Sequence, residues 1–197
     1  ALDHEIDFFQ PEKLDDEAFE RLSAEDWDLF IVIAYGGILP QRFIDLPNYG
    51  TLNVHYSLLP RWRGATPVEA TILAGDTETG VTIQQMRFKL DSGPSIAQAR
   101  IMLDGDETSG QLREVLTEIG SELLVETLLE YLNGNIPIAE QDEELVTTCS
   151  RIAKSDGEIS LDMPAEELWR RYRAYMPWPG LFFFDKDGKR VKITQAR

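Results

Sequence analysis

The feature that most restricts the fold is a nearly unbroken apolar segment, Asp28–Ala34, in a chain whose strand and helix patterns alternate. A strand with so little polar alternation is typical of a sheet covered on both faces. Further strand patterns lie at residues 51–55, 80–86 and 95–103, and helix patterns lie at residues 15–24, 40–44, 66–74 and 108–132. This alternation predicts an α/β fold with an open, mainly parallel sheet and helices on both faces.

Both ends of the chain carry additional patterns. Ile6–Pro11 is interpreted as a short strand. Residues 133–158 are polar and interrupted, which is typical of a linker, and a helix is expected over Ala165–Tyr175. Two short apolar segments around an Asp-Gly turn then predict a hairpin. We therefore divide the chain into a catalytic domain (1–133), a linker (134–158) and the beginning of a small second domain (159–197).

Charge is distributed unevenly along the 197 residues, whose net charge is −16. Residues 1–150 contain 9 Lys or Arg against 28 Asp or Glu, whereas residues 151–197 contain 10 against 7. Phosphate binding depends on Lys and Arg, so an RNA contact is expected to begin in the second part. A solvated charged face is the alternative interpretation of that part.

Composition also restricts compartment and cofactors. Cys149 is the one cysteine, so no internal disulfide can form, and a reducing compartment, the cytoplasm, is expected. The longest apolar run, Leu29–Tyr35, is too short to cross a membrane, and no leader pattern opens the chain. The two histidines and the cysteine are scattered, so no metal site is expected. A Gly-rich phosphate motif is also missing.

Three polar residues at predicted strand ends form the candidate catalytic site. Asn53 and His55 are two positions apart and therefore point to the same side of their strand. Asp91, in a Leu-Asp-Ser-Gly segment, also follows a strand, and in open α/β sheets ligands bind beyond such strand ends. An amide, an imidazole and a carboxylate can stabilise an oxyanion and move a proton without a metal. These residues predict acyl transfer. A hydrogen-bonded structural histidine and a turn-capping aspartate are the alternative interpretations.

Several segments together resemble the formyltetrahydrofolate-dependent formyltransferase family, and within it the enzymes that act on methionyl-tRNA. The run from Asn53 to Gly64 is specific to the wider family, and the linker and Pro-Trp-Pro-Gly segments narrow the resemblance. The resembling segments are Ala34–Pro40, Asn53–Gly64, Ala74–Ile83, Leu90–Gly93, Gln141–Glu143, Lys154–Ile159, Tyr172–Tyr175 and Pro177–Gly180. The resemblance implies a Rossmann-like catalytic domain followed by the start of an OB-like β-barrel.

The resemblance also implies roles for individual residues. Asn53, His55 and Asp91 would be catalytic, and 10-formyltetrahydrofolate would donate the formyl group to the α-amine of initiator methionyl-tRNA. The implied folate-binding residues are Tyr35, Gly36, Gly37, Ile38, Leu39, Ser57, Leu58, Leu59, Pro60 and Leu90. The implied acceptor contacts are Arg61, Arg63 and Gly64. Trp178 is instead expected to anchor the packing of the second domain.

Departures from the family leave alternatives open. Family members begin before residue 1 and continue after residue 197, so we expect a piece of a longer enzyme that is a monomer at full length. Tyr56 stands where many relatives have a small residue, and it is expected to crowd the mouth of the site. One alternative function is a nucleotide-sugar N-formyltransferase. Another is an inactive folate-binding fragment.

Overall fold

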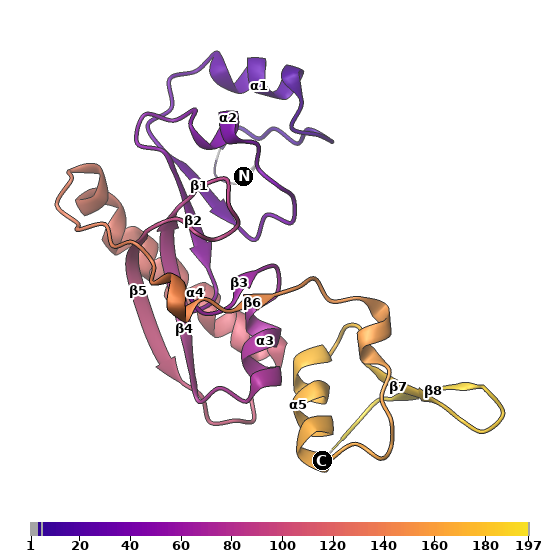
Figure 1. Cartoon of the computed structure of the whole chain (residues 1–197). Helices are drawn as coiled ribbons and strands as arrows, with labels where there is room; N and C mark the ends of the chain where they lie inside the picture. Colours follow the sequence, from indigo (N-terminus) through magenta and orange to yellow (C-terminus); the bar gives the residue numbers. More distant parts are fainter. Residues whose placement is uncertain (1–3, 5, 197) are drawn as a thin grey trace.

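A computed structural model describes residues 4 and 6–196 and contains a central four-stranded sheet in the order β1-β2-β4-β5 (Figure 1). Strand β1 is parallel to β2, whereas β2–β4 and β4–β5 are antiparallel. The strands are β1 (Phe30–Ile33), β2 (Thr51–His55), β4 (Glu78–Gln85) and β5 (Ser95–Met102). The α/β fold class is confirmed, but the sheet is mixed, because the chain reverses direction at β4 and again at β5.

The long helix α4 (Ser109–Leu132) covers one face of the sheet. It begins with a capping box between Thr108 and Gln111, which satisfies backbone N–H groups at the helix start. At Gly120 an added Cβ would lie 3.0 Å from Val54 of β2 and 3.3 Å from Val81 of β4. This close approach buries the apolar side of β2 and β4. Within the described residues, no helix is long and apolar enough to cross a membrane.

The opposite face of β2 is polar near its end and is covered at its beginning by α2 (Gln41–Ile44). The Thr51 hydroxyl donates a hydrogen bond to the Ile44 carbonyl oxygen at 2.8 Å. Phe43 of α2 is fully buried and packs edge-to-face on Phe19 of α1 (Asp16–Ser23), with ring centroids 5.3 Å apart. Helices therefore lie on both sides of the sheet, as predicted, although the edge strand β1 is packed on one face only.

The C-terminal part packs on α3 (Pro67–Ala74) through α5 (Ala165–Tyr175). Ala174 and Tyr175 belong to the same apolar cluster as Val68 and Leu181, so one core runs from the sheet into this part. Strands β7 (Leu181–Phe184) and β8 (Arg190–Ile193) form the predicted hairpin. This small sheet is consistent with the beginning of a barrel.

The segment predicted as a linker contains three short elements and pairs with β3 and β5. Its strand β6 (Thr148–Cys149) is parallel to β3 (Arg63–Gly64). Two 3₁₀ turns, η2 (Glu143–Leu145) and η3 (Lys154–Gly157), flank β6. Residue Ala139 also pairs with Ser95 at the start of β5. This segment is polar because some of its residues are exposed to solvent, while others form hydrogen bonds with the part of the chain that contains the sheet.

Two predictions near the N-terminus are wrong in detail. The described residues 6–11 form no strand, and Ile6 and Phe8 remain largely exposed, because no described strand lies beside them to accept their backbone hydrogen bonds. The apolar composition of β1 predicted two covered faces. Ile31 and Ile33 are 41% and 49% exposed, since β1 is the edge strand of the described sheet and only one of its faces is packed.

We expect Leu116→Ala to lower the free energy of unfolding by about 2–5 kcal/mol, because Leu116 is completely buried between α4 and the sheet. The control is Leu129→Ala, the same substitution in the same helix at a position that is 67% exposed. It should change stability by less than about 0.5 kcal/mol. Urea denaturation followed by circular dichroism measures both. Equal losses in the two variants would contradict this placement of the core.

Candidate active site

The polar face of the sheet is generated by the register of β2 and β4. Asn53 lies opposite Gln84, and His55 lies opposite Thr82. Directly opposed residues of antiparallel strands point to the same side, so these four side chains share the face that points away from α4. The two-residue spacing predicted that Asn53 and His55 lie together, and the structure shows that they do.

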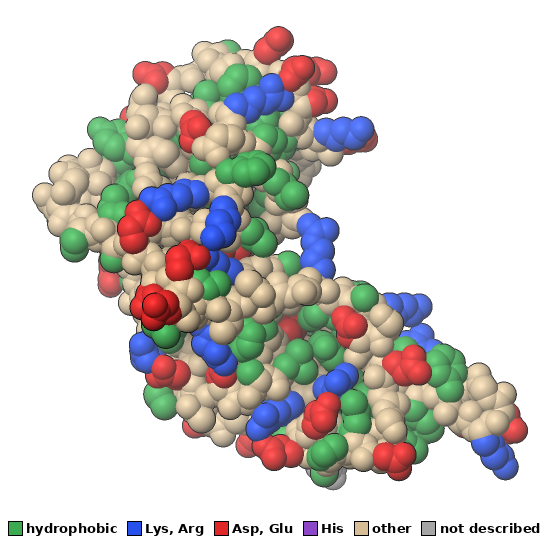
Figure 2. Space-filling view, in the orientation of Figure 1, with side chains coloured by type: hydrophobic (Ala, Val, Ile, Leu, Met, Phe, Trp, Pro, Cys, Tyr) green, Lys and Arg blue, Asp and Glu red, His purple; other side chains and the backbone are tan. Residues whose placement is uncertain are grey.

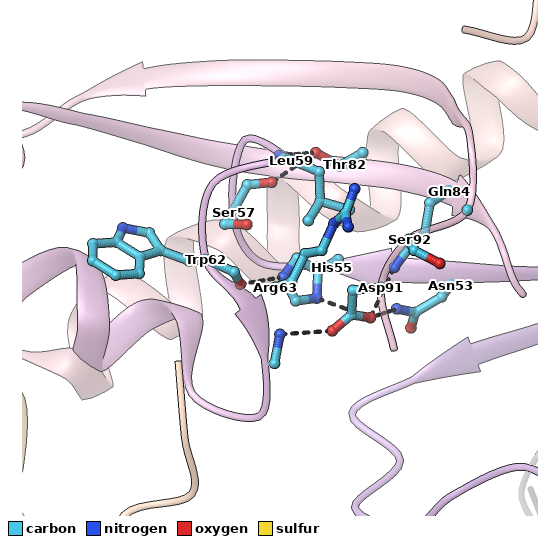
Figure 3. Close-up of polar contacts among 12 residues, drawn as sticks. Asn53, His55, Ser57, Leu59, Trp62, Arg63, Thr82, Gln84, Asp91 and Ser92 are labelled. Atoms are coloured by element: carbon cyan, nitrogen blue, oxygen red, sulfur yellow. Dashed lines mark hydrogen bonds and ion pairs between the residues drawn. The ribbon is translucent and has the colours of Figure 1, made fainter. Parts of the chain in front are cut away.

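Asp91 reaches this face from the turn between β4 and β5 (Figure 3). Its Oδ2 accepts a hydrogen bond from the Gly64 backbone N–H at 2.8 Å, and its Oδ1 accepts one from Gln84 Nε2 at 2.9 Å. Asn53 Nδ2 lies 3.5 Å from the same Oδ1. The carboxylate is therefore held by neutral donors from three separate segments, and Asn53 makes only a long contact with it.

The hydrogen bonds of His55 assign a role to each ring nitrogen. Nε2 lies 2.9 Å from the carbonyl oxygen of Trp62, which can only accept, so Nε2 carries a proton. Nδ1 lies 3.7 Å from Asp91 Oδ1, too far for a direct hydrogen bond but close enough for an ion pair if the ring is protonated. His55 is 6% exposed. Proton exchange with a ligand must therefore use Nδ1.

The loop after β2 is fastened to the polar face, and this fixes the Trp62 carbonyl beneath His55. The Thr82 hydroxyl donates to the Ser57 carbonyl at 2.7 Å and accepts from the Leu59 N–H at 3.0 Å. Ser57 Oγ donates to the Arg61 carbonyl at 2.6 Å. Trp62 adopts a positive φ of 61°, which turns the backbone sharply before β3. These hydrogen bonds join the loop to β4 and to itself.

A cleft of about 680 Å³ opens over the Asn53–His55–Asp91 group. This volume is within the usual range for small-molecule sites. It brings together eight of the residues predicted from the sequence. These are Asn53, His55 and Asp91, together with Tyr35, Gly36, Gly37, Gly64 and Leu90. Tyr56 lies on the wall of the cleft, with its hydroxyl 3.1 Å from Oγ1 of Thr117 on α4, which also lines the cleft.

The other predicted binding residues lie outside this cleft. Leu58, Leu59, Pro60 and Arg61 line a separate cleft of about 620 Å³. Ser57 is buried beneath the loop, and neither the exposed Ile38 nor the half-buried Leu39 is among the residues that line the site. Residues 57–60 therefore contribute nothing to the lining of the cleft over His55.

The two arginines of the loop are both engaged within the protein. Arg61 makes a two-pronged ion pair with Asp76, at 2.6 and 2.8 Å, and this hydrogen bonding raises the pKa of Arg61. Arg63 is 3% exposed, and its guanidinium contacts Gln141 at 2.9 Å and Glu143 at 2.8 Å. Neither guanidinium is among the groups that line the cleft over His55.

Sequence reasoning missed several residues of the site. Gln84 was missed although its register opposite Asn53 follows from pairing the two predicted strands. Glu69 and Arg113 form an ion pair on the cleft wall, and Glu69 Oε2 has no hydrogen-bond partner in the described structure. Trp178 also lines the cleft and is 58% exposed, so its predicted role as a packing anchor is wrong.

Neither a reactive thiol nor a metal centre is found among the described groups near the cleft. Cys149 carries the one thiol of the chain, and burial raises its pKa, which disfavours the reactive thiolate. Among residues 4 and 6–196, no group of three or more His, Cys, Asp or Glu side chains could hold a metal ion. Asn53 and His55 offer donors to a ligand, and Asp91 offers a carboxylate.

Two family models match most of the chain. A family described as formyl transferase matches residues 3–128, and the formyl transferase C-terminal domain matches residues 151–197. Methionyl-tRNA formyltransferases from two strains of Treponema pallidum, one of them the Nichols strain, are each 42% identical over 197 residues. This match covers the whole chain and 61% of the length of each relative.

Solved structures share the fold. A 4-N formyltransferase from Francisella tularensis is 22% identical with a TM-score of 0.77, covering 90% of this chain and 73% of that one. HypX from Aquifex aeolicus, in complex with tetrahydrofolic acid, is 20% identical with a TM-score of 0.72, covering 84% of this chain and 28% of that one. The solved structures show a shared fold, and the family match over residues 3–128 shows that the chain belongs to the formyl transferase family.

Proposed function

We propose that this chain transfers the formyl group of 10-formyltetrahydrofolate to the α-amine of initiator methionyl-tRNA. The observation that carries the proposal is the convergence of Asn53, His55 and Asp91 on one cleft in a chain of the formyl transferase family. The 42% identity to methionyl-tRNA formyltransferases favours this acceptor over an amino sugar. The chain covers only 61% of the length of those relatives, so the statement that it carries out the whole reaction is itself a proposal.

The reaction begins with attack of the neutral α-amine on the formyl carbon. An α-amine has an ordinary pKa of about 8, so a useful fraction is neutral near pH 7. The carbonyl oxygen gains negative charge as the carbon becomes tetrahedral. Asn53 Nδ2, whose contact with Asp91 is long, can donate to this oxygen, and so can a protonated Nδ1 of His55.

Proton transfer then completes the exchange. The attacking nitrogen must lose one proton, and the Asp91 carboxylate can accept it directly or through a water, because its two oxygens retain acceptor capacity beyond their present bonds. Collapse of the intermediate breaks the bond between the formyl carbon and N10, and N10 takes up a proton. No residue forms a covalent intermediate in this scheme.

The donor would occupy the apolar part of the cleft. Tyr35 and Leu90 are exposed side chains in its lining, and they offer apolar surface to a pterin ring. Gly36 and Gly37 carry no side chain, so the backbone can approach a ligand closely. This arrangement matches the usual composition of a cofactor pocket, in which apolar walls surround a few polar groups.

The tRNA would approach from the C-terminal part, where basic residues outnumber acidic ones. Its Lys and Arg side chains include Arg171 of α5 and Lys189 and Arg190 at the β7–β8 hairpin, and basic groups are visible at the hairpin tip in Figure 2. Trp178 connects this part to the cleft. A phosphate backbone lying along α5 and the hairpin would therefore direct the acceptor end toward His55.

We expect formyl transfer to methionyl-tRNA and none to a nucleotide-linked amino sugar when both acceptors are offered with 10-formyltetrahydrofolate. Product formation followed by mass spectrometry measures both reactions. Transfer to the sugar alone would replace this proposal with the amino-sugar enzyme. Absence of transfer to either acceptor, together with measurable folate binding, would identify an inactive folate-binding piece.

Asn53→Ala should lower kcat about 10²–10³-fold, because one donor to the developing oxyanion is lost. The control is Asn135→Ala, which makes the same substitution in the exposed loop after α4, where the side chain bonds Glu130. It should retain the unaltered rate. Steady-state kinetics at saturating donor measures both variants, and a normal kcat in Asn53→Ala would contradict the assigned role.

A further inference from the structure

Gln141, on the segment that follows the catalytic domain, contacts the backbone of the turn that carries Asp91. Its Nε2 lies 2.9 Å from the Asp91 carbonyl oxygen and 2.6 Å from that of Gly93. Both neighbours are acceptors only, so this end of the amide must be the NH₂ group. Its Oε1 then faces Arg63 Nε at 2.9 Å, which is a donor only. All three contacts agree on one orientation of the amide.

Arg63 holds the Gln141 amide in this orientation through a hydrogen bond to its Oε1. The guanidinium is buried, and besides Gln141 it donates to Glu143 Oε1 at 2.8 Å, while Lys89 donates to Glu143 Oε2 at 3.3 Å. Hydrogen bonding to Arg63, and next to Lys89, lowers the pKa of Glu143, so this carboxylate remains charged at neutral pH. The bonds run in one chain from Arg63 through Gln141 to the Asp91 turn.

Backbone pairing holds the same segment on both sides of Gln141. Ala139 and Ser95 exchange two hydrogen bonds, at 2.8 and 3.0 Å. Further on, the Arg63 N–H donates to the Thr147 carbonyl at 2.9 Å, and β6 pairs with β3. At Gly64 a Cβ would lie 2.0 Å from the Cys149 carbonyl oxygen, so the two strands approach as closely as only glycine permits. We name residues 139–149 the strap.

The turn beneath the strap requires such support. Asp91 has a φ of 46°, a left-handed conformation that costs a residue with a side chain on the order of 1 kcal/mol. Gly93 lies so close to β4 that an added Cβ would be 1.7 Å from the Gln85 carbonyl oxygen. A displacement of this turn would move the Asp91 carboxylate away from His55 and Asn53.

We propose that Gln141 and Arg63 are positioning residues, which clamp the Asp91–Gly93 turn from the strap and thereby set the position of the Asp91 carboxylate relative to His55 and Asn53. The kinetic consequence rests on the proposed formyl transfer. The structural consequence does not depend on it. The strap is thus a part of the catalytic site contributed by the chain between the sheet and α5.

The first test compares Gln141→Ala with Glu144→Gln, a substitution in the same strap at an exposed side chain that contacts neither the turn nor Arg63. The chain has two histidines, so the His55 ring signals in a proton–nitrogen NMR spectrum can be assigned with a His4→Gln variant. Movement of the carboxylate changes the field at the His55 ring. We expect those signals to shift in Gln141→Ala and to remain unchanged in Glu144→Gln.

The second test is kinetic. At a temperature well below the unfolding of every variant, Gln141→Ala should lower kcat about 10- to 100-fold, the range expected for a small misplacement of a catalytic group. The KM for donor and acceptor should stay within about twofold, because Gln141 is not among the residues that line the cleft. Arg63→Lys keeps the charge but cannot contact Gln141 and Glu143 as a fork, so it should lose kcat in the same way.

Unshifted His55 signals in Gln141→Ala would overturn the proposal, and so would a loss of kcat that Glu144→Gln shares. If the unaltered protein shows no formyl transfer, the proposed function fails, while the NMR comparison still decides whether the strap positions Asp91. The two failures are therefore distinguishable.

Discussion

The Asp91 carboxylate is the group on which the arrangement of the site depends. It receives a backbone N–H from Gly64 and an amide from Gln84, and it faces His55 Nδ1 at 3.7 Å. Each of these contacts joins a different segment: β3 before α3, the middle strand β4, and the end of β2. Burying a carboxylate costs free energy unless hydrogen bonds replace those it made with water. The hydrogen bonds that stabilise the buried Asp91 carboxylate therefore also hold these segments together.

One face of β2 packs in the apolar core, and the other face carries the polar residues of the site. Leu52 and Val54 belong to the apolar core that packs beneath α4, while Asn53 and His55 point to the other side. A shift of one residue in register would exchange the two sets and destroy core and site together. The side chains of Asn53 and His55, which we propose to be catalytic, are thus positioned by the same strand pairing that buries the core.

Helices and strands whose apolar residues follow a clear local period were predicted well from the sequence. The apolar period of α4, the β2 strand and the α5 helix were all predicted within one or two residues of their bounds. The two-residue spacing of Asn53 and His55 likewise predicted their common face. The direction of β4 and β5 was not predicted, since strand polarity depends on chain reversals that leave no periodic signal.

Long-range contacts account for what the sequence could not predict. Arg63 was expected at the acceptor, yet its partners, Gln141 and Glu143, lie about 80 positions away, and no local pattern links them. Trp178 was expected in a core and instead lines the cleft, because the C-terminal part folds back over α3. The polar composition of residues 134–158 fits an exposed linker as well as it fits a strap that bonds to the Asp91–Gly93 turn. Composition alone therefore could not predict the strap.

The central claim is that the negative charge of the Asp91 carboxylate serves the reaction as a proton acceptor. Asp91→Asn removes this charge, while asparagine has nearly the same size and tolerates the left-handed backbone conformation at this position. The measurement is kcat for formyl transfer to methionyl-tRNA, made on a variant whose circular dichroism shows it folded. The account predicts a loss of about 10²–10⁴-fold, as expected when a positioned proton acceptor is removed. A folded Asp91→Asn variant that transfers formyl at the unaltered rate would contradict it.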